Sequence, residues 1–213
     1  VSLNLDTFRL VVLVSLVPAV LAVLSLALGA VEIKPKGSAK APKFALASLG
    51  KQFLIFMLIV GLFDLGNSSD AFLVLRAQER GISVLGILGM LAIFNFVYAA
   101  ISTPAGKLSD RVNRRTLIIG GWLVYALVYL GFGLASQLWH VWALYVLYGL
   151  YYGMAYGTAK AMVADLVPAE LRGTAYGTYN AILGIIDFPA SLIAGILWQG
   201  VGRWQGLGPS APF

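Results

Sequence analysis

Six apolar runs, each about as long as a helix that crosses a bilayer, constrain this chain more than any other feature. A spanning helix needs about 20 consecutive apolar residues. The runs occupy residues 10–31, 46–75, 84–103, 116–135, 141–164 and 174–198. The second is the weakest, because its outer part, 64–70, is polar. The sequence predicts an all-α, polytopic membrane helix bundle with about six transmembrane helices.

The composition excludes an ordinary soluble domain, because 60% of the residues are hydrophobic and only 11% are charged. In soluble domains roughly 45 to 50% of the residues are apolar and about 25% are charged. A core of this size cannot bury so much apolar surface, so lipid is expected to cover the remainder. The absence of cysteine excludes disulfides, thiolate metal sites and cysteine nucleophiles. The single histidine, His140, is expected in an interfacial cluster with Trp139 and Trp142 rather than at a metal.

The formal charge of +6 does not indicate nucleic-acid binding, because the basic residues lie between the apolar runs. Alternating the six runs places eleven Lys and Arg on one side and four on the other. By the positive-inside rule the richer side is cytoplasmic. The lysine-rich segment 32–50, which contains Pro35, Gly37 and Pro42, is therefore predicted to be a cytoplasmic linker between bundles. The predicted location is the plasma membrane, or the inner membrane of a Gram-negative cell, with several passes.

Two polar motifs fall in loops on the predicted cytoplasmic side. Residues 106–115 read Gly-Lys-Leu-Ser-Asp-Arg-Val-Asn-Arg-Arg, and residues 165–173 read Asp-Leu-Val-Pro-Ala-Glu-Leu-Arg-Gly. The first resembles the G-x-L-[AS]-D-R-x-G-R-R loop of the major facilitator superfamily, and the second is similar to that family's acidic-Pro-Arg-Gly loop. The resemblance covers nearly the whole chain.

The resemblance implies a place for each segment in a twelve-helix transporter. In the family such loops follow the second and eighth helices, so the six runs look like helices six to eleven. Residues 1–31 would be the last helix of the N-terminal bundle, 32–50 the basic linker, and 51–213 a C-terminal bundle of five helices without the twelfth. The chain is therefore expected to be a fragment whose partner, besides lipid and a small-molecule substrate, is the missing N-terminal bundle.

The first motif carries residues suited to joining helix ends. Gly106 is expected to let two helix ends approach closely, and Asp110 to accept hydrogen bonds from the free N–H groups of the next helix. Asn113 replaces the family's usual glycine, and asparagine also tolerates a left-handed turn. The basic residues would supply donors for acidic groups or lipid phosphates, and they are Arg111, Arg114 and Arg115.

In the family this cluster is a cytoplasmic latch between the two bundles. Carried over by resemblance, Asp110 and Arg111 would form the latch, with Asp165 and Arg172 as neighbours. The alternative is that the arginines only fix the topology, although topology requires positive charge and no acid.

Carboxylates inside spanning helices usually face a cavity or a partner, because burying them in lipid is unfavourable. Asp64, Asp70 and Asp187 are such residues. At 100° per residue Asn67 shares a face with Asp64, whereas Asp70 points about 120° away, so the two aspartates are not expected to form a dyad.

Helical spacing groups further residues. A polar stripe on the last run is expected to face the bundle interior, and it comprises Asn180, Gly184, Asp187 and Ser191. Small residues at every fourth position predict close helix packing, and they are Gly149, Gly153 and Gly157. Tyrosines on an adjacent face could line a substrate path or fill the core, and they are Tyr148, Tyr152 and Tyr156.

These patterns favour a secondary transporter in which Asp64 or Asp187 exchanges a proton as a cavity opens alternately to each side. The candidate pathway residues are Asp64, Asn67, Asp70, Tyr152, Asn180 and Asp187. No P-loop is present, which leaves ion coupling or facilitated diffusion. A polytopic membrane enzyme and a membrane scaffold are the alternatives. The first is disfavoured by the lack of Gly-x-Gly-Asp, H-E-x-x-H and G-x-S-x-G patterns, and the second by the polar stripe. No enzyme activity, cofactor or metal is expected.

Overall fold

A computed structural model describes residues 5–29 and 46–213, which fall into two units that are treated separately. The first unit contains α1, Leu5–Gly29, whose described side chains are exposed along its whole length. A helix with no buried face suits lipid or another protein surface. The end of the first predicted run and most of the predicted linker, residues 30–45, lie outside the described residues.

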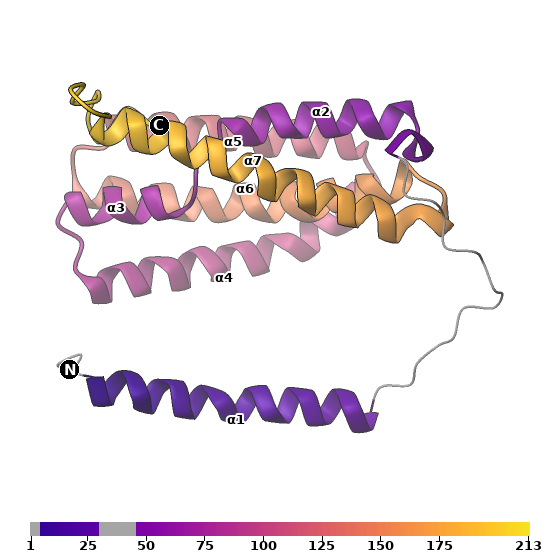
Figure 1. Cartoon of the computed structure of the whole chain (residues 1–213), viewed down its shortest axis with the longest axis horizontal. Helices are drawn as coiled ribbons and strands as arrows, with labels where there is room; N and C mark the ends of the chain where they lie inside the picture. Colours follow the sequence, from indigo (N-terminus) through magenta and orange to yellow (C-terminus); the bar gives the residue numbers. More distant parts are fainter. Residues whose placement is uncertain (1–4, 30–45) are drawn as a thin grey trace. The chain divides into compact units, whose positions relative to one another are not determined.

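The second unit is a bundle of helices (Figure 1). Its elements are η1 Leu46–Leu49, α2 Lys51–Leu65, α3 Ala71–Glu79, α4 Val84–Ser109, α5 Arg114–Leu134, α6 Leu138–Asp165, η2 Ala169–Leu171 and α7 Arg172–Gln199. The described residues form no strand beyond one isolated bridge in the turn after α7, between Val201 and Trp204. The all-α prediction is confirmed.

Helix length and composition agree with a membrane bundle. Four helical segments of the described chain are long and apolar enough to span a bilayer, namely Val12–Gly29, Val84–Ser109, Arg114–Leu134 and Ala169–Gln199. The helix α6 is longer than some of these, with 28 residues, but its many tyrosines and glycines lower its hydropathy. The helix α2, with 15 residues, is too short to span alone.

The prediction of one continuous helix over 46–75 is wrong, because α2 ends at Leu65 and α3 begins at Ala71. The intervening residues are Gly66, Asn67, Ser68, Ser69 and Asp70. Glycine, asparagine, serine and aspartate are poor helix formers whose side chains favour turns. We call residues 66–70 the helix break.

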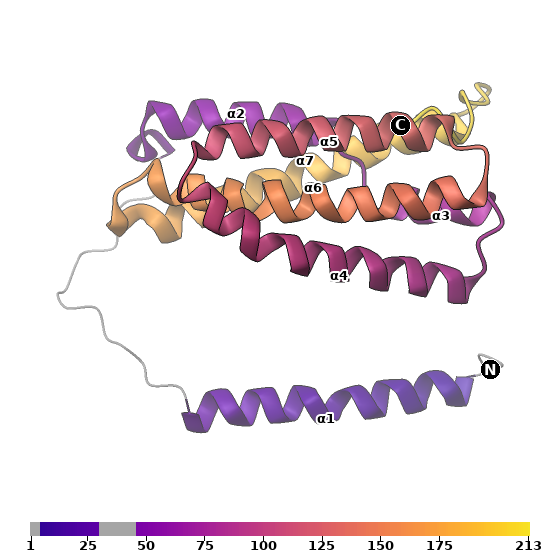
Figure 2. The same ribbon diagram turned by 180° about the vertical axis from the view of Figure 1, so that it is seen from behind.

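The central helix α6 packs along both α4 and α5, while α2 packs on α7 (Figures 1 and 2). Glycine makes the first of these contacts possible. A Cβ on Gly149 would lie 2.8 Å from the Phe94 carbonyl oxygen, and one on Gly153 would lie 2.6 Å from Ile101 Cγ2. Close packing is confirmed at these two glycines and wrong for Gly157, where a Cβ would meet nothing within 4 Å.

Loops at one end of the bundle contain both sequence motifs. The loops 110–113 and 166–171 lie at the same end, together with the start of α2 (Figure 2). We call this the motif end. At the opposite end lie the α3–α4 and α5–α6 connections and the C-terminal segment 200–213.

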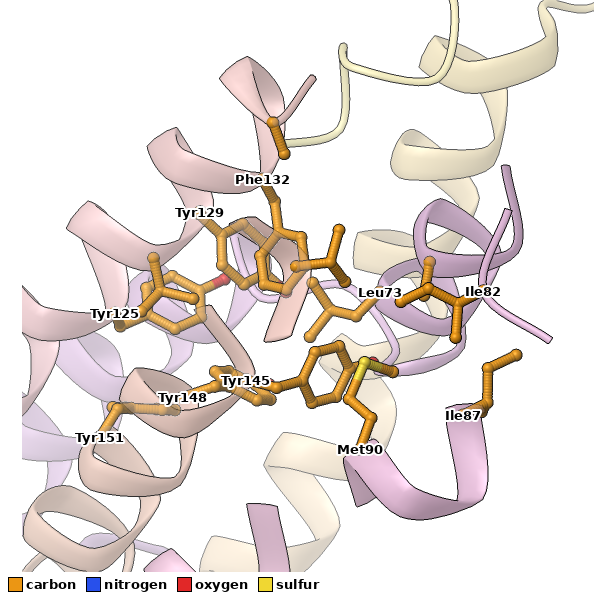
Figure 3. Close-up of a cluster of buried hydrophobic side chains, with 14 of the residues drawn as sticks. Leu73, Ile82, Ile87, Met90, Tyr125, Tyr129, Phe132, Tyr145, Tyr148 and Tyr151 are labelled. Carbon is orange, nitrogen blue, oxygen red and sulfur yellow. The ribbon is translucent and has the colours of Figure 1, made fainter. Parts of the chain in front are cut away.

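The core between α3, α4, α5 and α6 is rich in tyrosine (Figure 3). Its buried tyrosines are Tyr125, Tyr129, Tyr145, Tyr148 and Tyr151. A buried phenol fills space like phenylalanine, but its hydroxyl requires a hydrogen-bond partner. These rings therefore direct hydroxyl groups toward whatever acceptors the bundle interior offers.

Candidate functional site

Tyrosine hydroxyls from α5 satisfy the backbone of the helix break. The Tyr125 hydroxyl donates to the Gly66 carbonyl oxygen at 2.9 Å. The Tyr129 hydroxyl lies 3.4 Å from the Ser68 carbonyl oxygen and 3.3 Å from Asn67 Oδ1. Within a membrane a broken helix persists only where its freed polar groups find partners. The spacing of Tyr125 and Tyr129, one turn apart on α5, is the signal in the sequence that points to these contacts.

Asp70 ends the helix break and contacts α6. Its Oδ1 accepts a hydrogen bond of 2.6 Å from the Tyr148 hydroxyl, and its Oδ2 lies 3.4 Å from the Tyr152 hydroxyl. Both carboxylate oxygens thus have a phenolic partner. Tyr148 itself is only 1% exposed. Of the three tyrosines expected either to line a substrate path or to fill the core, Tyr148 therefore fills the core.

Asp64 lies near the end of α2 and is 8% exposed. Asn67 Nδ2 donates to its Oδ1 at 3.4 Å, whereas its Oδ2 is buried with no hydrogen-bond partner among the described residues. The contact with Asn67 was expected, but α2 ends between the two residues, so it arises from the turn and not from a shared helix face. Asp187 on α7 lines the same cavity as Asp64.

Two adjoining cavities connect these carboxylates. The first, of about 300 Å³, is lined by Asp64, Asp187 and Asn180 together with the rings of Phe63, Trp122, Tyr151, Tyr152, Tyr156 and Tyr179. The second, of about 690 Å³, is lined by Asp70, Asp187, Phe188 and three serines. Four residues line both, namely Asn67, Tyr152, Gly184 and Asp187. We call the combined region the carboxylate cleft.

The cleft brings together every residue of the predicted pathway. The polar stripe on α7 lies on it, but it does not face the interior of this bundle as expected. Asn180, Gly184 and Asp187 are exposed, while Ala175, Tyr179, Ala190 and Ala194 form the buried face of α7. The stripe therefore borders an open hollow. Ser191, the last residue of the stripe, accepts a hydrogen bond of 3.2 Å at its Oγ from the backbone N–H of Ser69.

At the motif end one ion pair joins the two sequence motifs. Arg114 Nε lies 2.7 Å from Asp165 Oδ2, and Arg114 Nη2 lies 3.8 Å from Asp110 Oδ1. The neighbouring Arg172 donates from Nε to the Ala164 carbonyl oxygen at 3.2 Å. Arg114 is thus the central cation of this cluster, and Arg111 is exposed.

Three expectations about the first motif are wrong. The N-cap of α5 is Asn113, whose side chain accepts from the backbone N–H of Arg115 at 3.0 Å, and not Asp110. Asn113 has φ −60° and ψ 123°, an extended conformation, so no left-handed turn is formed. A Cβ on Gly106 would meet nothing within 4 Å, so this glycine does not enable a close approach.

A buried arginine, one of the four basic residues predicted on the outer side, has a structural role. Arg76 on α3 is 1% exposed and donates to the carbonyl oxygens of Phe132, Gly133 and Ala135 at 3.2, 3.3 and 3.4 Å. It also donates to Ser210 Oγ at 2.7 Å and pairs with Glu79. The last carbonyls of a helix lack partners within the helix, so Arg76 caps α5 and holds the C-terminal segment.

His140 is a capping residue at the start of α6. Its Nδ1 accepts from the backbone N–H groups of Ser136 and Gln137, both at 3.3 Å, and its ring lies 4.3 Å from that of Trp139. Among the described residues no group of three or more His, Cys, Asp and Glu side chains could hold a metal ion.

Comparisons with known proteins give one family. The sequence model described as Major Facilitator Superfamily matches residues 44–207. An uncharacterised MFS-type transporter of Methanocaldococcus jannaschii is 35% identical over 163 residues, which cover 74% of this chain and 41% of the relative. The multidrug resistance protein MdtG of Proteus mirabilis is 35% identical over 133 residues, covering 59% of this chain and 32% of the relative.

MdtG of Yersinia enterocolitica is 32% identical over 138 residues, covering 62% of this chain and 33% of the relative. The chain therefore spans less than half the length of these curated relatives. No solved structure gave a significant match. The family match extends over more than half of the chain and includes both motif loops and the carboxylate cleft. This multi-pass membrane chain therefore belongs to the major facilitator superfamily.

Proposed function

We propose that this chain forms part of a secondary transporter that moves a small solute across the plasma membrane by proton-coupled alternating access. The observation that supports this most directly is the carboxylate cleft, in which Asp64 has a buried oxygen with no hydrogen-bond partner among the described residues and shares a hollow with Asp187. Family membership supports the general activity. The charges and the open hollow suggest how this chain would contribute to it.

A proton is the partner that would best satisfy the two carboxyl groups. Asp64 Oδ2 receives no hydrogen bond from a described side chain, and no described basic side chain lines either cavity. A buried carboxylate without a cation is strongly unfavourable, so a proton held by Asp64 and Asp187 would neutralise part of this charge. When the cleft opens to water on one side, the carboxyl would be hydrated and could release that proton.

Asn67 and Tyr152 would guide the solute between the two hollows, because both line each of them. The helix break supports such a role. Substrate and ion sites in transporters form where a spanning helix is interrupted and its backbone borders a cavity. Here the break lies beside Asp64 and Asp70, with hydroxyl partners from α5 keeping it in place.

Arg114, Asp110 and Asp165 would act at the cytoplasmic gate, with the motif end facing the cytoplasm. Their ion pairs join the loop after α4 to the end of α6. Arg111 in the loop after α4, Arg115 in the first turn of α5 and Arg172 at the start of α7 lie at the same end, and they would bind acidic groups or phosphates on the opposite wall of the gate. The basic charge of these loops also agrees with the positive-inside rule.

The test uses the protein expressed from its complete reading frame and reconstituted into liposomes that contain a pH-sensitive dye. Because two relatives are named multidrug resistance proteins, toxic small molecules are the first solutes to test. A solute that is transported should drive proton movement across the membrane. Asp64→Asn and Asp187→Asn, singly and together, should abolish this solute-driven proton flux.

Glu170→Gln is the matched control, because it removes one carboxylate from an exposed position at the motif end. It should leave proton flux unchanged. Undiminished proton-coupled transport in both single aspartate variants would refute the assignment of the proton site.

A further inference from the structure

The carboxylate cleft is unbalanced in charge. Three carboxylates line its two hollows, and no lysine, arginine or histidine lines either one in the described part of the chain. The nearest described cation on α6 is Lys160, whose Nζ lies 3.1 Å from the Tyr156 hydroxyl at the margin of the first hollow. We propose that the cleft recognises organic cations, an inference that rests on the proposed transport function and names its class of substrate.

The three carboxylates are not equivalent. Both oxygens of Asp70 already have tyrosine hydroxyls as partners, from Tyr148 and Tyr152. Asp64 Oδ2 accepts no hydrogen bond from the described part of the chain, and Asp187 is exposed in the cleft. The positive charge of a ligand would therefore lie between Asp64 and Asp187, where it would compensate their negative charge. An anion would meet like charges that no described cation in the cleft compensates, which is unfavourable.

Aromatic rings in the first hollow favour a weakly hydrated organic cation over a metal ion. Its lining includes Tyr151, Tyr152, Tyr156 and Tyr179. The structure contains an example of the interaction expected there, since Lys160 Nζ lies over the Tyr156 ring, 4.3 Å from its centroid. Quaternary ammonium, phosphonium and guanidinium groups bind aromatic faces in this way, because the charge is attracted to the π-electron density.

The dimensions agree with a ligand of drug size. The hollows of about 300 and 690 Å³ share four lining residues, and small-molecule sites have volumes of roughly 300 to 1,000 Å³. A ligand could place its cationic group near Asp187, which borders both hollows, and its apolar body against the rings of the first. Phe63 and Trp122 would support that body as a stacked pair, with ring centroids 4.3 Å apart.

The experiment compares two ions that differ chiefly in the sign of their charge, tetraphenylphosphonium and tetraphenylborate. Their size and apolar surface are nearly the same. Equilibrium binding of each is measured to the protein expressed from its complete reading frame in lipid nanodiscs, and binding to empty nanodiscs is subtracted. The phosphonium ion should bind at least tenfold more tightly than the borate. Equal binding, or tighter binding of the borate, overturns the proposal.

Variants locate the site. Asp64→Asn together with Asp187→Asn should weaken phosphonium binding at least tenfold, while Glu170→Gln should not change it. Asn180→Asp adds a carboxylate at an exposed position of the cleft, where folding is not at risk, and should tighten phosphonium binding several-fold. Unchanged phosphonium binding in the double variant and in Asn180→Asp also overturns the proposal.

These results are separate from those of the transport assay. Proton-coupled transport of neutral solutes that depends on Asp64 and Asp187, without preference for the phosphonium ion, would refute the cation inference alone. Selective phosphonium binding that requires both aspartates, without proton movement, would refute the coupled transport and leave the cation site in place.

Discussion

Replacing Arg76 with methionine should destabilise the bundle more than any other loss of a single basic residue. Methionine retains most of the side-chain length but leaves the carbonyls of Phe132, Gly133 and Ala135 without their donor. Removing one partner of a buried charged network destabilises by roughly 3 to 5 kcal/mol, because the remaining groups stay buried and unpaired. The loss of the ion pair with Glu79 contributes less to this destabilisation, since the Glu79 side chain is 35% exposed and can be hydrated.

The assay is thermal unfolding of the purified protein in detergent, followed by helical circular dichroism. For a chain of this size the loss in free energy of unfolding corresponds to a melting temperature lower by roughly 10 °C. Arg203→Met is the control, because Arg203 is exposed at the same end of the bundle. Arg76→Lys should lie between the two, because one ammonium cannot reach all the acceptors of a guanidinium. Equal melting temperatures for Arg76→Met and Arg203→Met would refute the capping role.

Three further predictions concern single contacts. Gly153→Ala should lower the free energy of unfolding by about 1 to 3 kcal/mol, because the added methyl group forces α6 away from Ile101. Gly157→Ala should leave stability nearly unchanged. Equal denaturation midpoints for the two variants would contradict the role of Gly153 in packing. Asn113→Ala should destabilise the protein by about 0.5 to 2 kcal/mol, because α5 loses its N-cap. In the same measurement Asn113→Ser should retain most of the stability, because serine is also a good N-cap. Tyr125→Phe should speed amide hydrogen exchange in the helix break, because a carbonyl there loses its hydroxyl donor, and unchanged exchange would show that this bond does not hold the break.

Residue patterns predicted the helices well where a helix is continuous. The apolar runs corresponding to α4, α5 and α7 could be identified because each contains enough apolar residues to cross a bilayer, and the run corresponding to α6 could be identified by its length despite its lower hydropathy. The helix break could not be placed in this way. A hydropathy pattern treats an apolar run as one helix with a single axis. Asn67 and its neighbours leave the helix because α5 offers hydroxyl partners that only the folded bundle brings near.

The candidate site was predicted in part. Asp64, Asp70 and Asp187 stood out because carboxylates are rare in apolar runs, and the structure places all three on one cleft. The role of Arg76 could not be predicted, because all its partners except Glu79 lie 56 to 134 residues away in the sequence. The exposed position of the α7 stripe was missed for a related reason, since periodicity identifies a polar face but not which neighbour covers it.

Cysteine labelling on α7 tests whether the carboxylate cleft is a water-accessible passage. In a background without other cysteines, Gly184→Cys and Ile185→Cys are compared in intact membranes with a small water-soluble thiol reagent. Gly184 lines both hollows and has room for a side chain, whereas Ile185 is 71% exposed and lines neither hollow. Rapid labelling is expected at position 184 and little at position 185. Protection of position 184, or equal labelling of the two, would contradict it.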